Sequence, residues 1–422
     1  MWTEHFVNTI PRTMPVRTYV YRLHPTRAQH AQLQTILRDQ RHLYNAALQE
    51  RREAWSKSGI SVKLNDQTKS LTEIRHFDDA YGGVPYNISK WTLKRLDDAF
   101  KGFFRRLKSR GKAGFPRFRT VSRWNSFGLH QIAGVRLRDL RLAFSGGITG
   151  GLKIRKHRPL PKGSVIRSAV FTREAGIWRV ALSCQVPEYA ANDDGNVLGI
   201  DVGVNYLATD SSGRHYENLR PQAAMSRRVR IAQRAVARGR KGSKRRRKTV
   251  AKLQRLKRTE RNSRTTHFHD VANAIVRSAS TIVVEDLKLK NMTRSARGTL
   301  ATPGKNVRQK AGLNRVLQDA ASGRLISMIA YKAESAGGRV IKVDPKNTSR
   351  TCSACGIVDA AQLSRSRYLC GCGLDLQRGY NAAINIKLRG IQTLHEVARG
   401  LEDANVAGCR KRRPVNADPL AA

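Results

Sequence analysis

The hydrophobic pattern in the first half of the chain predicts one strand, two long helices and then a run of short strands. Residues 16–23 (VRTYVYRL) alternate as a strand does, and residues 24–55 carry apolar side chains at helical spacings. A second helix is predicted over residues 89–108, whose apolar stripe is rich in leucine and phenylalanine. From about residue 124 to 187 the pattern changes to short β segments, including a hairpin that turns at residues 174–176.

The second half of the chain contains three apolar strands that end in polar residues. They are VLGIDVG (197–203), TIVVED (281–286) and RVIKVD (339–344). The acidic, polar stretch 188–196 precedes them and indicates a domain boundary. Residues 226–264 contain 18 Lys or Arg and one Glu, with apolar residues between them, which predicts helices with basic outer faces. Strands alternating with helices favour an α/β domain.

The charge of the chain indicates a polyanionic partner. Of 422 residues, 80 are Lys or Arg and 31 are Asp or Glu, so the formal net charge is +49. Such self-repulsion favours a protein that binds nucleic acid, although charge alone does not say which nucleic acid. No run approaches 18 apolar residues, and the first residues lack the apolar core of a signal peptide, so we expect no membrane span and a cytoplasmic location.

Four of the six cysteines form a metal-ligand pattern. Cys352 and Cys355 are separated from Cys370 and Cys372 by 14 residues. Two tight turns that each present a pair of thiolates can close a tetrahedral Zn²⁺ site, and a site filled by four protein ligands has a structural role. The alternative is four unrelated buried thiols. Six cysteines are too few for a disulfide scaffold in a chain of this length. A zinc site in a reducing compartment is therefore the better interpretation.

Two strand-end carboxylates are candidate catalytic ligands. Asp201 ends the apolar run 197–200 and has Gly203 nearby, and Glu285 ends the run 282–284 in the same manner. Carboxylates on neighbouring strands of a ribonuclease-H-type sheet can hold Mg²⁺ for phosphodiester cleavage by water. Either residue alone is more often a solvated turn residue, but the pair in so basic a chain favours the metal site.

Several segments together resemble the TnpB family, the RNA-guided nucleases of certain insertion sequences, and the miniature type V CRISPR effectors. The resemblance covers most of residues 16–389, and its motifs are GIDVGVNYLATDSSG (199–213), IVVEDLKLKNM (282–292), GGRVIKVDPKNTSRTCSACG (337–356), YNAAINI (380–386), YVYRLHPTRAQ (19–29), LYNAAL (43–48) and GFPRF (114–118).

The resemblance implies an α/β protein of two lobes. The N-terminal lobe would pair a β-barrel wedge with a helical recognition insertion, and the C-terminal lobe would be a ribonuclease-H-like RuvC domain carrying a zinc ribbon. The expected boundaries are 1–23 and 120–190 for the wedge, 24–119 for the recognition domain, 191–349 and 376–422 for RuvC, and 350–375 for the ribbon.

The resemblance also implies an activity and its partners. Guide RNA would pair with target double-stranded DNA while the protein reads a short flanking motif, and a Mg²⁺-dependent RuvC site would then cut the DNA. The expected location is the cytoplasm of a prokaryote, with no membrane partner. Both a monomer and a homodimer on one guide are compatible with the resemblance. A general RNA-binding structural protein is a weaker alternative, because the paired carboxylates argue against it.

The sequence departs from the family pattern at the third metal-binding carboxylate. That aspartate precedes the Asn of the Asn-Ala-Ala segment by two residues, and the slot holds Gly379. Three accounts follow: Asp375 reaches the metals instead, the site works with fewer ligands, or the protein is a guided DNA binder that acts by occupancy. A simpler interpretation is that Gly379 caps the helix beginning near Tyr380.

Further residues are candidates for contact with nucleic acid. Arg95 and Arg105 lie on the second predicted helix and could grip a guide–target duplex, although a solvated helix face is the alternative. Tyr44 and Asn45 lie in a segment that resembles the family, which implies contact with flanking DNA. The basic run of Arg245, Arg246 and Arg247 is a candidate for RNA binding.

Overall fold

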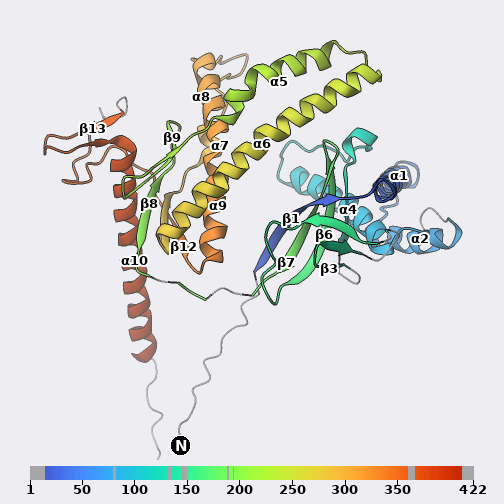
Figure 1. Ribbon diagram of the computed structural model, residues 1–422, viewed down its shortest axis with the longest axis horizontal. Coiled ribbons are helices and arrows are strands. Elements are labelled where there is room, and N and C mark those ends of the chain that lie inside the picture. Colours follow the sequence, from blue (N-terminus) through green and yellow to red (C-terminus); the bar gives the residue numbers. More distant parts are fainter. Residues whose placement is uncertain are drawn as a thin grey trace, which may run out of the picture. The chain divides into compact units, whose positions relative to one another are not determined.

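The structure is a computed structural model, and it separates into two compact units that meet in sequence at residues 188 and 189 (Figure 1). No helix in the part that it describes is long and apolar enough to cross a membrane. The described residues are 15–78, 82–130, 135–144, 148, 150–187, 190–192, 194–359 and 366–410.

Unit 1 is built on a seven-stranded antiparallel sheet with the strand order β2-β6-β7-β1-β5-β4-β3. Alternate side chains of β1 and β7 are buried, as expected for a sheet with one face in the core. The strands are β1 (Val16–His24), β2 (Ser126–His130), β3 (Arg136–Arg138), β4 (Arg141–Ala143), β5 (Leu152–Arg155), β6 (Val165–Glu174) and β7 (Ile177–Gln185).

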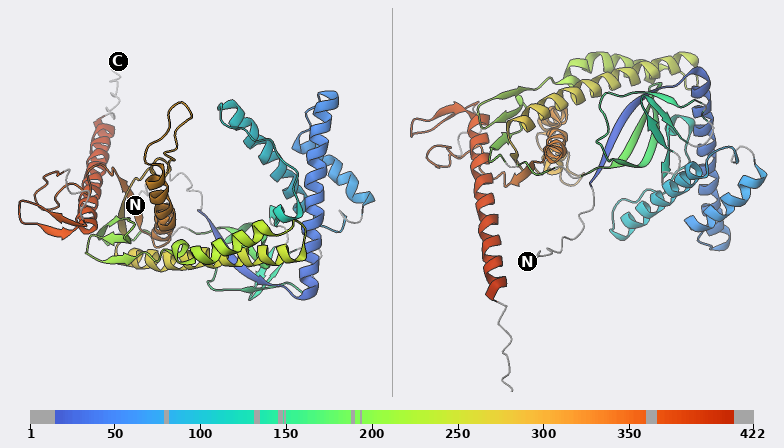
Figure 2. Two further views of the ribbon diagram at one scale, coloured as in Figure 1. Left: turned by 90° about the horizontal axis from the view of Figure 1, so that it is seen from above. Right: turned by 60° about the horizontal axis from the view of Figure 1, so that its bottom comes forward.

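In the described part of unit 1, the sheet is accompanied by the α-helices α1 (Arg27–Ser58), α2 (Leu64–Phe77) and α4 (Tyr86–Lys108) (Figure 2). Helix α1 begins at a capping box, in which Thr26 Oγ1 accepts from the Gln29 amide at 3.2 Å and the Gln29 side chain accepts from the Thr26 amide. It ends at Gly59, whose φ of 67° is the left-handed conformation that glycine adopts without strain. Helices α1 and α4 bury leucines against the sheet in a single core.

The sheet of unit 1 is open, so the predicted β-barrel is wrong. Its edge strands are β2 and β3, and no pairing joins them among the described residues. Strands β3 and β4 have three residues each, so the β3 edge offers few backbone groups for pairing. Helix α4 packs over β2 instead, with the Trp91 indole only 2.6 Å from where a Cβ on Gly128 would lie.

Unit 2 is built on a five-stranded mixed sheet with the strand order β10-β9-β8-β11-β12. Strands β8, β11 and β12 are parallel, and β9 and β10 extend the sheet in antiparallel hairpins. A separate two-stranded ribbon consists of β13 (Arg367–Leu369) and β14 (Asp375–Gln377). The five strands are β8 (Val197–Asp201), β9 (Tyr206–Asp210), β10 (His215–Glu217), β11 (Thr281–Glu285) and β12 (Arg339–Val343).

Helices cover both faces of this sheet, which explains why every residue of β11 is buried (Figure 1). On one face, Ile282 and Val284 pack in the core formed with α6 (Lys244–Ser278) and α9 (Ser322–Ser335). On the other face, Val283 packs with Ile386 of α10 (Arg378–Arg410). The remaining helices are α5 (Pro221–Arg238), α7 (Leu289–Met292) and α8 (Val307–Ala320).

Helix α10 lies directly on β8. A Cβ added to Gly199 would come within 2.1 Å of the Ala383 carbonyl oxygen, so only glycine allows this approach. The predicted basic helices are confirmed as α5 and α6, which run side by side and are joined at residues 239–243 (Figure 1).

Candidate active site and metal centre

Two carboxylates lie next to each other at the carboxyl ends of β8 and β11. The parallel register pairs Ile200 of β8 with Val284 of β11. The next residue on each strand is the carboxylate, Asp201 on β8 and Glu285 on β11. Ile200 and Val284 point into the core under α6 and α9. Because side chains alternate along a strand, Asp201 and Glu285 point to the opposite face, which α10 covers.

Burial outweighs the nearby positive charges at this pair of acids. Burial raises the pKa of Asp201 to about 7, the Glu285 carboxylate adds to the rise, and Arg378 opposes it. Burial also raises the pKa of Glu285, while a hydrogen bond from Thr348 Oγ1 and the charge of Arg389 act the other way. A hard divalent cation bound by both oxygen ligands would stabilise the ionised forms, so the pair fits such an ion in charge and ligand type.

Gly379 opens directly onto Asp201 from the first turn of α10. A Cβ built on Gly379 would lie 3.0 Å from Asp201 Oδ2 and 3.2 Å from Thr209 Oγ1. Gly379 is not among the glycines with positive φ, so its backbone also suits a residue with a side chain. The glycine is therefore not required by the helix start, and an acid at this position would face Asp201.

Asp375 lies elsewhere, at the start of β14 in the two-stranded ribbon. Its Oδ1 accepts from Arg367 Nε at 2.8 Å, and this hydrogen bond holds the pKa of Asp375 below its usual range. Within the described part of the chain, no recorded interaction joins Asp375 to Asp201 or Glu285. The structure thus brings two of the three predicted catalytic carboxylates together and places the third in a half-exposed ion pair.

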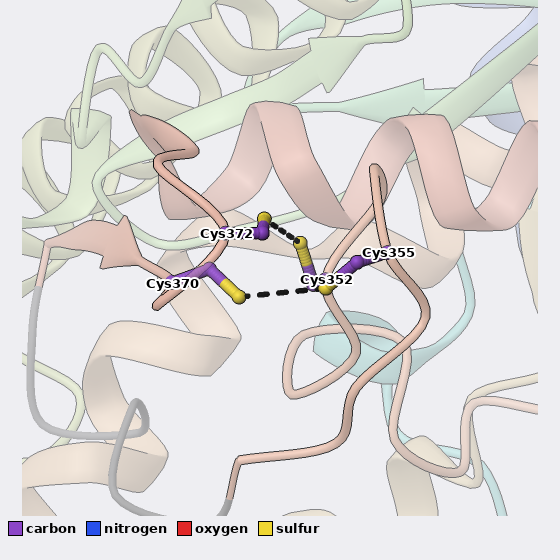
Figure 3. Close-up of side chains that lie close together, drawn as sticks. All are labelled: Cys352, Cys355, Cys370 and Cys372. Atoms are coloured by element: carbon purple, nitrogen blue, oxygen red, sulfur yellow. Dashed lines mark hydrogen bonds between the residues drawn. The ribbon is translucent and has the colours of Figure 1, made fainter.

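The four predicted zinc ligands converge (Figure 3). Their sulfur atoms all lie within 4.8 Å of one another, with Cys352 Sγ 3.7 Å from Cys372 Sγ and Cys355 Sγ 3.6 Å from Cys370 Sγ. A tetrahedral site with Zn–S bonds of about 2.3 Å has sulfur–sulfur edges of about 3.8 Å. The cluster is therefore compatible with one zinc ion bound by four thiolates.

Two buried asparagines of α10 connect the cysteine cluster to the carboxylates, and the sequence analysis missed both. Asn381 Oδ1 accepts from the Ser353 amide at 2.9 Å, and its Nδ2 donates to the Thr351 carbonyl at 2.8 Å. Asn385 Nδ2 donates to the carbonyls of Thr348 and Thr351. The pattern that could have revealed them is a pair of amides four residues apart on an otherwise apolar helix face.

Thr348 completes the link, because its hydroxyl donates to Glu285 Oε1 while its carbonyl accepts from Asn385. The segment that carries Cys352 is thus fixed to the same helix that carries Gly379. We call Thr348, Asn381 and Asn385 the amide clamp.

The basic residues of α5 and α6 differ in their surroundings. Arg245 and Arg247 are exposed, whereas Arg246 is half-buried and its Nε donates to the Val236 carbonyl at 3.2 Å. Arg264 is also internal, since its Nη2 lies 2.8 Å from Asp319 Oδ1. The exposed arginines are available to a polyanion, and the other two help to hold the helices in place.

The four candidates in unit 1 are also placed differently. Tyr44 is only 1% exposed and packs against Trp124, which is at odds with the prediction that it contacts DNA. Asn45 exchanges hydrogen bonds with the backbone of Arg119 at 3.0 and 2.8 Å. Arg95 stacks over Trp124 at 4.6 Å, and Arg105 is exposed.

Three family models match this chain. One is described as "Probable transposase" (OrfB_IS605) and matches residues 181–296. Another is described as "Cas12f1-like, TNB domain" and matches residues 323–386, the part that contains the cysteine cluster. A "Helix-turn-helix domain" model of the OrfB_IS605 group matches residues 14–59, which in this structure contain β1 and the single continuous helix α1.

Whole-length relatives support these matches. The chain is 29% identical over 363 residues to "Putative RNA-guided DNA endonuclease InsQ" of Escherichia coli, covering 84% of this chain and 87% of that protein. It is 28% identical over 383 residues to a "Putative RNA-guided DNA endonuclease" of Streptomyces pristinaespiralis, covering 89% of each.

The fold also has a counterpart among solved structures. A cryo-EM structure of a "Cas12f1-sgRNA-target DNA complex" matches with a TM-score of 0.53 at 16% identity, covering 86% of this chain and 83% of that one. This likeness shows a mixed α/β fold of the same kind. Together these findings confirm the resemblance that the motifs indicate.

Proposed function

We propose that this relative of the OrfB_IS605 and Cas12f1 proteins is an RNA-guided DNA endonuclease. The observation that carries the proposal is the pair Asp201 and Glu285 at the ends of adjacent parallel strands. Two relatives of that name cover 84% and 89% of the chain. The test is cleavage of DNA that matches the guide by the chain loaded with its own RNA.

The units are assigned roles on the same basis. Residues 1–23 and 120–190 are the wedge, whose described strands form the open sheet of unit 1, and residues 24–119 are the recognition domain. Residues 191–349 and 376–422 are the RuvC domain, and residues 350–375 are the zinc ribbon. The Cas12f1-like matches support this division, since they cover the ribbon by sequence and most of the chain by fold.

The nuclease centre would use Asp201 and Glu285 to bind Mg²⁺. The bound ion would polarise the scissile phosphate and activate water. Thr348 orients the Glu285 carboxylate by donating a hydrogen bond to it, and Arg378 offsets part of the negative charge at Asp201. The two carboxylates supply part of a metal site, and Gly379 supplies no ligand to the remainder.

A second candidate function is guided DNA binding without cleavage, and Gly379 is the observation that favours it. The space beside Asp201 that a third acid would occupy is bounded by the neutral side chains of Thr209 and Gln377. The prediction that Asp375 serves instead requires it to leave Arg367, 2.8 Å away. If Asp375→Ala cuts DNA as the unaltered protein does, Asp375 is not the third ligand.

Guide RNA and target double-stranded DNA are the proposed partners. The net charge of +49 suits two polyanions, and α5 and α6 present exposed arginines. A homodimer on one guide is compatible with this proposal. Because the relatives from Escherichia coli and Streptomyces are bacterial, we propose that the protein acts in the cytoplasm of a prokaryote.

Replacing Arg245 and Arg247 with glutamine is expected to weaken guide RNA binding and to reduce its salt dependence. Each lost phosphate contact should lower the slope of log affinity against log salt by about 0.7–0.9. The measurement is RNA affinity over a range of salt concentrations. Arg246→Gln is the matched control, because the half-buried Arg246 bonds to Val236 and its loss should lower thermal stability with less effect on the slope.

The proposed zinc ion makes its own prediction. Cys352→Ser should release about one zinc per chain and expose residues 345–380 to protease, because metal binding worth about 10–16 kcal/mol would otherwise stabilise the fold. Metal analysis and limited proteolysis measure both effects. The control is Cys184→Ala, which removes a buried thiol of β7 outside the cluster and should leave zinc bound. Zinc-free protein with the same protease resistance would contradict the prediction.

A further inference from the structure

Unit 1 contains an aromatic cavity that none of the roles above uses. It has a volume of about 620 Å³ and lies between the end of α1, the α1–α2 link, α4 and the loop after α4. Phe100, Phe103 and Phe115 pack edge to face in it, with ring centroids 5.3–5.4 Å apart where Phe115 meets the other two. We call it the aromatic cavity.

Several of its apolar side chains are exposed. Trp55 is 65% exposed, Ile60 59% and Phe104 52%, although all three line the same cavity. A contiguous apolar surface of this kind on a soluble unit marks a binding site. An occupant that is present throughout the life of the protein would keep it covered.

The polar groups of the aromatic cavity identify the chemistry of that occupant. Four lining residues are basic and one, Asp97, is acidic, which leaves a net charge of +3 (four minus one). The Arg51 guanidinium is part of the cavity wall: Nε bonds to Gln67, Nη1 bonds to Asp97, and the group lies over the Phe100 ring, 5.2 Å from its centroid. An occupant should therefore offer a flat apolar face and negative charge.

We propose that the aromatic cavity binds one unpaired nucleotide of the guide RNA. The base would stack on the exposed ring of Trp55 or Phe104, since every base has a π face that aromatic side chains accept. The phosphate would lie at the cationic rim formed by Arg52, Lys63 and Lys101.

Charge and exposure favour RNA over the other occupants. A second copy of this chain carries the same charge of +49, which the basic rim would repel. Target DNA is bound only while it is engaged, whereas guide RNA remains with the protein and would cover the exposed rings throughout. This inference rests on the proposed function, because it assumes that the chain holds a guide RNA.

The experiment compares the unaltered protein with Trp55→Phe and Trp55→Ala, using RNA that co-purifies with the chain and is then removed and added back. RNA should quench tryptophan fluorescence in the unaltered protein, and Trp55→Phe should lose most of that quench while still binding. Trp55→Ala should bind the RNA about fivefold to a hundredfold more weakly. It should also free one or two nucleotides for chemical probing.

Phe77→Ala is the matched control, because Phe77 is 92% exposed on α2 but does not line the cavity, and its RNA affinity should be unchanged. Unchanged quench and affinity in both Trp55 variants would overturn the proposal. So would an altered sedimentation coefficient with normal RNA binding, which would identify a protein interface, or an effect confined to DNA binding. If the unaltered protein binds no RNA at all, the proposed function itself fails.

Discussion

Gly379→Asp is expected to increase the rate of guided DNA cleavage by at least about a hundredfold. Residues that only support a metal ligand change activity by up to about a hundredfold, and a direct ligand should have at least that effect. The new side chain would start 3.0 Å from Asp201 Oδ2, so its carboxylate would join Asp201 and Glu285 around the metal. The contact is close, but Asp201 Oδ2 is the end of a side chain and can shift by a few tenths of an ångström. The negative φ of residue 379 adds no backbone strain.

The measurement is the single-turnover rate of cleavage of matched DNA in Mg²⁺. Gly379→Asn is the control, because it has the same size and shape as aspartate but lacks the charge, and it should give little gain. A large gain with aspartate would show that the unaltered chain is a guided binder. If the unaltered chain already cuts as fast as the variant, the third carboxylate is dispensable and the second candidate function is excluded.

Asp201→Ala is expected to lower cleavage by a thousandfold or more, taking about 10³ as the cost of losing one charge-stabilising group at a reacting centre. Binding of guide RNA and matched DNA should change little, because base pairing and backbone contacts supply most of the binding energy. The comparison therefore needs two measurements on the same preparation, the cleavage rate and the DNA affinity. We suggest making it in the Gly379→Asp background as well, where the starting rate is expected to be higher.

Asp286→Ala is the matched control for Asp201→Ala. Asp286 directly follows Glu285 in the chain, is half-exposed and lies 3.5 Å from Lys342 Nζ. Its substitution should leave cleavage unchanged, which would show that the loss depends on position and not on removing any acid nearby. If Asp201→Ala cuts normally, the catalytic centre lies elsewhere and the assignment of the strand ends is wrong.

The central strands and their carboxylates could be predicted from sequence because the information is local. Apolar runs of three or four residues that end in Asp201 and Glu285 have few structural solutions, and parallel strands bring their carboxyl ends to one edge. Counting residues between motifs also located Gly379, which the structure places beside Asp201. Both inferences use short spacings along the chain, and short spacings constrain geometry well.

The features that could not be predicted depend on contacts between distant segments. Closure of the unit 1 sheet depends on whether its edge strands β2 and β3 meet, and they come from segments on opposite edges of the sheet. Tyr44 was a candidate for DNA contact because of its segment, but Trp124, far along the chain, covers its ring at 5.1 Å. In the sequence, Asn381 and Asn385 are ordinary polar positions of a helix. Their role depends on hydrogen bonds to the segment that carries Cys352, which is about 30 residues away in the chain.

The ordinary backbone at residue 379 has an evolutionary consequence. Aspartate and glycine codons differ by a single base, and neither residue strains the backbone of this turn of α10. A lineage could therefore pass between a cutting and a non-cutting form by one point mutation, without compensating changes in the core. The amide clamp and the cysteine cluster would be retained in both forms, because they hold the fold whichever residue occupies the slot. In a host where bound DNA is less harmful than cut DNA, selection would then act on this one codon.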